Sequence, residues 1–384
     1  MTTGDDSATI ASSEAARTVG EVGERRVIEL LTRAALAASD ESTAEVPSDV
    51  GPVDAGPSAG SADASGDSRR RFADDIVVGS GDDAAVFDVG GPTVISVDTA
   101  VEGRHFRFDW SEARDIGARA VVQSAADIAA MGGRTVGVVV SVGCPSTTVV
   151  GLLLGLNDGI VTAAHRLGAR VLGGDLVESG EVVLSVTAVG AMDGRTPVAL
   201  TGAVVGDVLA VSGPLGAGAA GLAVLTERAT KGRSTWSIPE GPDADVVAAY
   251  RLPHPDLAQG IDAARAGAHA MTDISDGLIE ELVTMAKASG VRLSVDGARV
   301  PRTDAVTEVA RRLNVDADAW ALTGGEDHEL LAAFAPGTVP AGWTEIGSVL
   351  AGNAEGAGTV EVDGHGVDGL SGWQSFGPAD GTRG

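Results

Sequence analysis

The chain has 384 residues, and its acidic residues outnumber the basic ones 54 to 27, for a formal net charge of −27 at neutral pH. Such a charge disfavours nucleic acid and anionic membranes as partners, because both require a basic surface. A hydrophobic content of 44% supports a buried core, and the single cysteine excludes a disulfide framework and a cysteine-based zinc site. The apolar runs are too short to span a bilayer and no signal peptide is visible, so we expect a cytoplasmic protein.

The elements predicted in chain order alternate between short strands and helices. Residues 1–18 are small and polar and predict a disordered tail, and a helix is expected at 21–38. Residues 39–71 are almost entirely Ser, Asp, Gly, Pro and Ala, which predicts a disordered insertion. Strands are predicted at 93–97, 136–142, 170–172, 182–188, 208–212 and 291–295, and helices at 111–131, 147–167, 217–228, 243–250 and 277–289. We therefore expect an α/β or α+β protein with an N-terminal domain at 19–205 and a C-terminal domain at 206–384.

Several apolar runs end in aspartate, often beside glycine. They are GSGDDAAV (79–86), VISVDT (94–99), VLGGDLVES (171–179), MTDISDGL (271–278) and, of the same character, LTGGEDHELL (322–331). One such turn is ordinary turn chemistry. Mg²⁺, however, is commonly shared between one or two carboxylates and substrate phosphates, so the repetition favours a phosphate site with several metal ions.

Asp127 stands apart from these turns, because it falls in the apolar stripe of the helix predicted at 111–131. Buried carboxylates are rare unless they are paired or bind a metal. Two interpretations follow: an ion pair with Arg119, two turns earlier, or a metal ligand. The acidic turns favour the metal ligand.

Two short sequences match known motifs but lack all or part of the secondary structure that those motifs require. GPSAG at 56–60 matches a hydrolase elbow but lies in the low-complexity insertion. GAGAAG at 216–221 follows a strand and precedes a helix, as in dinucleotide-binding proteins, but the expected second strand ending in an acid is missing. Close packing by small residues is the favoured interpretation of this motif. No P-loop pattern is present in the sequence.

Taken in order, GDDAAV, VDTAVEGRHF, DIAAMG, GGD, DISDGL and TGGEDHELL resemble the motifs of the thiamine-monophosphate kinase family, in the aminoimidazole ribonucleotide synthetase superfamily. The resemblance runs from about residue 23 to residue 373, interrupted by the insertion. It implies a two-domain fold and a homodimer whose N-terminal sheets form a barrel. It also implies ATP-dependent phosphorylation of thiamine monophosphate to thiamine diphosphate with several Mg²⁺ ions.

The resemblance also assigns roles to residues. Around the metal ions it places Asp83, Ser96, Asp98, Asp127, Asp175, Asp273 and Asp276. It places Gly174, Asp175 and Ser275 at ATP, and His105, Glu326 and Trp373 at the thiamine end. An aromatic ring such as Trp373 suits a cationic thiazolium, although a core tryptophan is the alternative.

Four positions depart from the family pattern. Leu200 stands where an arginine usually reaches ATP, Leu176 and Val97 replace threonines, and His328 replaces a tyrosine. The mechanism expected is direct in-line transfer, because a phosphomonoester acceptor is largely ionised at neutral pH and needs no general base.

Two alternatives remain open from the sequence. One is another ATP-dependent member of the same superfamily. The other is a non-catalytic protein that binds divalent cations, which is disfavoured because the acids cluster at strand ends and no calcium-loop pattern is present.

Overall fold

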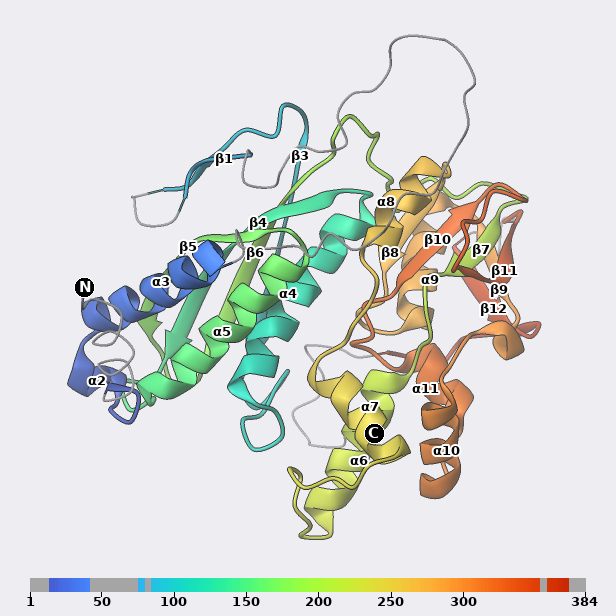
Figure 1. Cartoon of the computed structure of the whole chain (residues 1–384). Helices are drawn as coiled ribbons and strands as arrows, with labels where there is room; N and C mark the ends of the chain where they lie inside the picture. The colour runs from blue at the N-terminus through green and yellow to red at the C-terminus, as the bar shows by residue number, and fades with distance from the viewer. Residues whose placement is uncertain (1–13, 42–74, 80–83, 353–357, 373–384) are drawn as a thin grey trace, which may run out of the picture.

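The computed structural model describes residues 14–41, 75–79, 84–352 and 358–372. Asp83, Trp373 and most of the predicted insertion lie outside these residues. The described chain forms two large sheets with helices packed against them (Figure 1), as expected for a two-domain mixed α/β fold.

The N-terminal half is built on a four-stranded sheet in the order β3-β6-β4-β5. Its strands are β3 (Thr93–Val101), β4 (Arg134–Cys144), β5 (Arg170–Glu178) and β6 (Val183–Ala191). β4 and β5 are parallel, and the other neighbours are antiparallel. Helices α4 (Ala113–Ala130) and α5 (Val150–Arg166) cover one face, with α3 (Glu24–Glu41) beside α5 (Figure 1).

The structure differs from the single helix predicted at 21–38 at both ends of that range. α3 continues to Glu41, and a short helix α2 (Val19–Val22) precedes it with Thr18 as its N-cap. Where the sequence predicts a disordered tail, the segment just before α2 lies along the start of α5: Val150 N donates to Arg17 O at 2.8 Å. A two-stranded pair, β1 (Ile76–Val78) with β2 (Val86–Phe87), follows α3 in the described chain.

Glycines allow α4 and α5 to approach closely. A Cβ on Gly117 would lie 2.0 Å from Leu156 O, and one on Gly159 would lie 1.9 Å from Arg114 O. Real Cβ atoms do not come so near a carbonyl oxygen, so these positions require glycine. A core made mostly of Ala, Val, Leu and Ile, with few aromatic residues, suits such narrow spacing.

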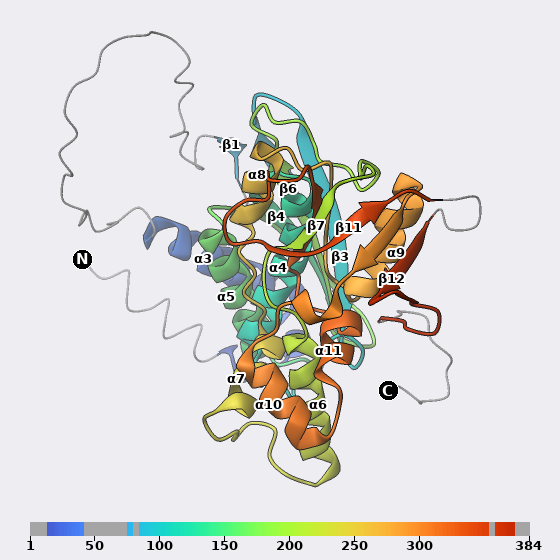
Figure 2. The same ribbon diagram turned by 90° about the vertical axis from the view of Figure 1, so that its right-hand side faces the viewer.

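The C-terminal half contains a seven-stranded sheet in the order β13-β12-β9-β11-β7-β10-β8. Its strands are β7 (Val208–Val211), β8 (Ala270–Asp273), β9 (Arg292–Val295), β10 (Leu330–Phe334), β11 (Thr344–Leu350), β12 (Thr359–Val362) and β13 (His365–Gly366). The helices are α6 (Ala217–Thr230), α7 (Pro242–Arg251), α8 (Ala258–Arg265), α9 (Leu278–Ser289), η2 (Gly297–Arg299), α10 (Asp304–Leu313) and α11 (Ala317–Thr323). In both views α6, α7, α10 and α11 gather at one end of this half (Figures 1 and 2).

Helix α4 packs against both halves of the molecule. Its alanines Ala125, Ala126 and Ala129 share a buried cluster with Met271 of β8 and Phe334 of β10. Their small side chains bring the helix close to the C-terminal sheet while its other side lies on β3 and β6. Side chains carried by α4 can therefore reach groups of both domains. Among the described helices, none is both long and apolar enough to cross a membrane.

Candidate active site

Asp127 lies on α4 and faces strand β3. The Ser96 hydroxyl on β3 donates a hydrogen bond to Asp127 Oδ2. Asp98 follows two residues later on the same face of the strand, because alternate strand residues share a face, and it lies beside Ser124 of α4. One strand and one helix therefore bring together Ser96, Asp98 and Asp127, as expected from the sequence.

Arg119 decides between the two interpretations of Asp127. Its guanidinium Nη2 lies 2.7 Å from Glu326 Oε2, and its Nη1 donates to Tyr250 O at 3.1 Å. The ion pair between Arg119 and Asp127 is therefore wrong, because Arg119, two turns earlier on α4, is directed to the C-terminal half instead.

Two turns of the C-terminal half face this group. Asp273 ends β8, and the turn that follows it carries Ser275 and Asp276. Glu326 lies in the turn before β10, which pairs with β8. Glu326 N donates to Ser275 O at 2.7 Å, so the two turns are hydrogen-bonded to each other.

His328 links the two turns through its side chain. Its Nδ1 lies 3.2 Å from Asp273 Oδ2, and its Nε2 lies 3.3 Å from Glu326 Oε2. Burial opposes the charged imidazole, but the two carboxylates outweigh it and raise the pKa of His328 to about 10. His328 is therefore a cation at neutral pH. The resemblance leads one to expect a tyrosine at this position, so this charge comes from one of the four departures noted in the sequence.

The carboxylates of the two domains shift one another's pKa. Burial, together with the charge of Asp273, raises the pKa of Asp127 to about 6. Burial likewise raises the pKa of Asp98 and of Asp276, with added repulsion from Asp273 and Glu326. Because these repulsions cross from α4 and β3 to the turn after β8, the acids form one electronegative cluster, which we call the acidic group: Asp98, Asp127, Asp273 and Asp276.

Two side chains near this cluster were not singled out from the sequence. Glu281, in the first turn of α9, has its pKa raised to about 7 by burial and by the charge of Asp273. Gln123 of α4 donates through Nε2 to Glu326 Oε2 at 2.9 Å. Gln123 lies one turn before Asp127 on the helix, and this spacing is the feature of the sequence that could have placed it near the site.

The donor chemistry of the acidic group fits Mg²⁺. Carboxylate and hydroxyl oxygens are the ligands that this hard cation prefers, and burial, with added repulsion among the acids, raises the pKa of these carboxylates. Within the described residues, however, no three His, Cys, Asp or Glu side chains lie in an arrangement that could hold one metal ion. The fit therefore rests on the type and crowding of the donors, with Ser96 beside them.

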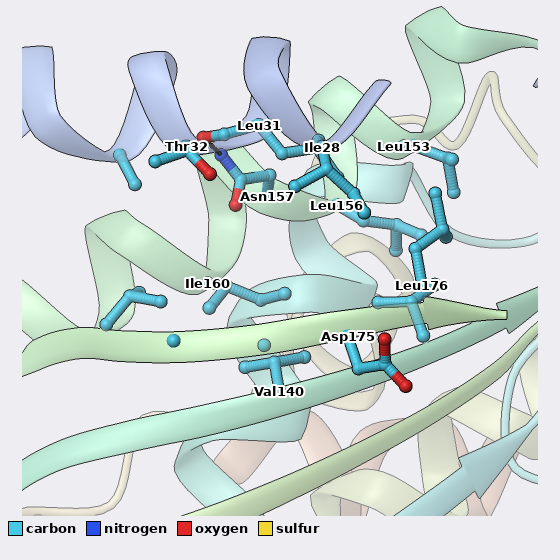
Figure 3. Close-up of a pocket in the computed structure, with 15 residues that line it drawn as sticks. Ile28, Leu31, Thr32, Val140, Leu153, Leu156, Asn157, Ile160, Asp175 and Leu176 are labelled. Atoms are coloured by element: carbon cyan, nitrogen blue, oxygen red, sulfur yellow. Dashed lines mark hydrogen bonds between the residues drawn. The ribbon is translucent and has the colours of Figure 1, made fainter. Parts of the chain in front are cut away.

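Gly174 and Asp175 lie apart from the acidic group. Asp98 is opposite Val186, Val186 is opposite Val140, and Val140 is opposite Gly174, so Gly174 shares the helix-covered face with Asp98. Asp175, the next residue, points to the other face of the sheet, and Figure 3 shows its carboxylate directed away from the helices. Strands β6 and β4 separate β5 from β3, so one chain does not bring Asp175 to the other acids.

A cavity of about 100 Å³ lies beside Gly174, between α3, α5 and the sheet (Figure 3). Apolar side chains line most of it, among them Ile28 and Leu31 of α3 and Leu156 of α5. Asn157 gives it a polar edge, and its Nδ2 donates to Leu31 O at 3.1 Å. The cavity therefore suits a mainly apolar group.

The residues expected at the thiamine end are only partly described. His105 lies in the turn after β3, where Val101 N donates to its Nδ1 at 3.1 Å. Trp373 lies outside the described residues, but Gly372 before it lies against the turn that carries Asp276. Gly372 N donates to Glu280 Oε1 at 2.9 Å. The chain therefore reaches the acidic group just before Trp373.

The start of α6, where GAGAAG matches a dinucleotide motif, is occupied by a carboxylate of the chain itself. Asp327 Oδ2 accepts from Gly216 N at 2.6 Å, and Oδ1 accepts from Gly218 N at 3.0 Å. A phosphate would need these same amides. The packing interpretation of the motif therefore agrees with the structure.

Leu200 and Leu176, two of the departures from the family pattern, have apolar surroundings. Leu200 packs against the C-terminal core, and its carbonyl accepts from Ser289 Oγ at 3.2 Å. Leu176 is buried in the N-terminal core, below α5.

Two family models match most of the chain. The N-terminal domain of AIR synthase related proteins matches residues 81–192, and the C-terminal domain of the same proteins matches residues 204–359. Thiamine-monophosphate kinase from Mycobacterium tuberculosis is 44% identical over 313 residues, which cover 81% of this chain and 89% of that protein. The chain belongs to the thiamine-monophosphate kinase family.

Further relatives agree with this family. The Corynebacterium glutamicum thiamine-monophosphate kinase is 38% identical, over 77% of this chain and 88% of that protein. The structure of the Stenotrophomonas maltophilia kinase aligns with a TM-score of 0.66 at 29% identity, covering 76% of this chain and 92% of its own. A structure of AaThiL complexed with AMPPCP and TMP aligns with a TM-score of 0.66 at 26% identity, covering 80% of this chain and 92% of its own.

Proposed function

We propose that the protein phosphorylates thiamine monophosphate to thiamine diphosphate with ATP as donor. The observation that carries this proposal is the acidic group, in which Asp98 and Asp127 of one domain face Asp273 and Asp276 of the other. An assembly of this kind, drawn from two domains beside the ion-paired Glu326, suits two polyanionic substrates held by cations. The family membership supports the same reaction.

In the proposed reaction, a terminal phosphate oxygen of thiamine monophosphate attacks the γ-phosphorus of ATP. The bond from that phosphorus to the β-phosphate oxygen breaks, and ADP leaves. The acceptor has a second pKa of about 6, so at neutral pH it is mostly ready to attack without a general base. The chain's residues therefore act by holding donor and acceptor in line.

Several Mg²⁺ ions, when bound, would neutralise the phosphate charge in this reaction. Ser96 and the acidic group would hold them, together with Asp83, whereas Asp175 is left out of this set because its side chain lies on the opposite face of β5. Ser275 and Gly174 would contact ATP, with the adenine in the apolar cavity beside Gly174. His105, Glu326 and Trp373 would meet the thiamine end.

We also propose a homodimer closed through the N-terminal sheet. The face opposite the helices exposes Ile95, Val97, Val139 and Val177, at 68%, 58%, 38% and 47%. β3 and β5 are its two edge strands within the described residues. An apolar face with two open edges favours pairing with a second copy, which would close both edges into a barrel.

Such a dimer would explain the distance between Gly174 and the acidic group. If β5 of one protomer pairs with β3 of the other, the adenine cavity of one copy lies next to the acidic group of its partner. We therefore propose that each site draws its nucleotide pocket from one protomer and its acidic group from the other, in the cytoplasm where ATP is available.

The experiment that tests the function uses the full chain with ATP, Mg²⁺ and thiamine monophosphate, with thiamine diphosphate and ADP measured together. We expect the two products in equal amounts, and none with Asp127→Asn under the same conditions. ADP formation without thiamine diphosphate would favour another ATP-dependent member of the superfamily. Cation binding without turnover of ATP would favour the non-catalytic alternative.

A further inference from the structure

Three donors converge on a single oxygen of Glu326. Arg119 Nη2 lies 2.7 Å from Oε2, Gln123 Nε2 lies 2.9 Å from it, and His328 Nε2 lies 3.3 Å from it. Within the described residues, no hydrogen bond ends on Oε1. The carboxylate is therefore anchored through one oxygen, and the other is left as an acceptor.

The anchor is itself held in place. The Arg119 side chain is 6% exposed, its Nη1 donates to Tyr250 O at 3.1 Å, and its guanidinium carbon lies 5.3 Å from the centroid of the Tyr250 ring. A planar guanidinium bonded on both nitrogens has one orientation available. The Glu326 side chain is 25% exposed, so the fixed carboxylate still reaches open space.

The backbone at Glu326 agrees with this arrangement. Its φ is +74°, in the left-handed region that few non-glycine residues adopt. Such a conformation persists where the surrounding contacts hold it, and it is typical of sites where one side chain must point in a set direction. Here those contacts come from Arg119 and Gln123 of α4, in the other domain.

We propose that Arg119 is a positioning residue for the acceptor substrate. It does not touch the substrate; it fixes Glu326 across the domain boundary, so that Oε1 accepts a hydrogen bond from an N–H donor of the substrate. This inference rests on the proposed function, in which the donor is the amine of the aminopyrimidine ring of thiamine monophosphate. ATP has no part in this contact, so its binding is not affected.

The proposal predicts a split between the two substrates. Because hydrogen bonds to charged groups are individually strong, Arg119→Met raises KM for thiamine monophosphate about tenfold and leaves KM for ATP within about twofold. Arg119→Lys keeps the charge and restores most of the lost affinity. Arg114→Met, on the same helix in an exposed ion pair with Asp158, is the matched control and changes neither KM.

A double-mutant cycle separates positioning from a structural role. If Arg119 acts through Glu326, R119M adds less than about twofold to the KM increase of Glu326→Gln. R119M/E326Q also removes both charges of the ion pair, so neither is left without its partner and the double variant folds even if R119M alone does not. Additive losses, an equal rise of both KM values, or an unchanged KM for thiamine monophosphate in R119M would overturn the inference.

Direct binding distinguishes this inference from the proposed function. Thiamine monophosphate is titrated into the wild-type chain with Mg²⁺ and without ATP, and then into R119M. If the wild-type chain binds and phosphorylates it while R119M binds it equally well, only the role of Arg119 fails. If the wild-type chain neither binds nor phosphorylates it, the proposed function fails, and the inference with it.

Discussion

The Ser96 hydroxyl of β3 donates a hydrogen bond to Asp127 Oδ2 of α4, which joins the sheet to the helix that lies between the two domains. Asp127 thus points toward the strand and the other three carboxylates of the acidic group. Arg119, on the same helix, points toward Glu326. Arg119 and Asp127 are eight positions apart. Because their partners differ, we expect mutations at the two positions to have different effects.

We expect Asp127→Asn to lower kcat by at least about a hundredfold, since a displaced catalytic ion removes several kcal/mol of transition-state stabilisation. Stability should be kept or improved, because burial and Asp273 disfavour the charge that the change removes. The denaturant midpoint and kcat are measured on one preparation. An unstable but active variant would contradict the metal assignment.

Metal removal provides a second test of the wild-type chain and the Asp127→Asn variant. Mg²⁺ should raise the melting temperature of the EDTA-treated wild-type chain, because a bound cation relieves the repulsion among the acids. The increase should be smaller in Asp127→Asn, with ionic strength matched by NaCl. Equal increases in the two proteins would place the bound cation elsewhere.

Glu329 should make stability depend on pH. Burial raises its pKa to about 7, although the Ser212 hydroxyl donates to its Oε2 at 2.5 Å. Between its unfolded pKa near 4.5 and about 7, the folded chain holds the proton that the unfolded chain has lost, so this contribution to stability falls as pH rises. Denaturant midpoints at pH 5 and pH 7.5 should differ less in Glu329→Gln than in wild type. An unchanged pH dependence would be evidence against the shift.

Asp327→Ala should destabilise the chain by about 1–2 kcal/mol, because it leaves two amides at the start of α6 without their acceptor. Urea unfolding measures the loss, and Asp327→Asn, which keeps one acceptor oxygen, should recover part of it. If GAGAAG instead bound a dinucleotide, Asp327→Ala would open the amides and strengthen binding of such a ligand. We expect no binding in either protein.

Co-purified heterodimers test whether each site uses both protomers. A dimer of one Asp127→Asn chain and one Ile28→Trp chain, whose larger ring fills the adenine cavity, should keep about half the wild-type activity, because one of its two sites receives both native parts. A wild-type chain paired with the double variant should be nearly inactive. The opposite pattern would place Asp127 and the adenine cavity of one chain in the same site.

Trp373→Ala should raise KM for thiamine monophosphate by roughly five- to thirtyfold, as expected for the loss of stacking on a cationic ring, with KM for ATP nearly unchanged. Gly372, the last described residue, lies against the turn that carries Asp276. Equal effects on both substrates, with a lower melting temperature, would support the core interpretation of Trp373.

The sequence by itself determined the local elements, and it predicted the chemistry of the site. Periodicity predicted strands and helices that agree with β3, β4, α4 and α5, since burial on one face leaves a pattern of its own. Aspartates at the ends of apolar runs predicted oxygen ligands. The helix stripe predicted that Asp127 is buried, because its neighbours on that side are apolar, and the structure has it half-buried against β3.

Tertiary structure decided which groups meet. The partner of Arg119 is Glu326, more than two hundred residues away, and no local spacing encodes such a pair. The same holds for the seven-stranded sheet, in which β7 lies between β10 and β11, because sheet order depends on packing among distant segments. Asp175 is the clearest case: its motif suggests a ligand beside Asp98, but the alternation of side chains along β5 places it on the opposite face of the sheet.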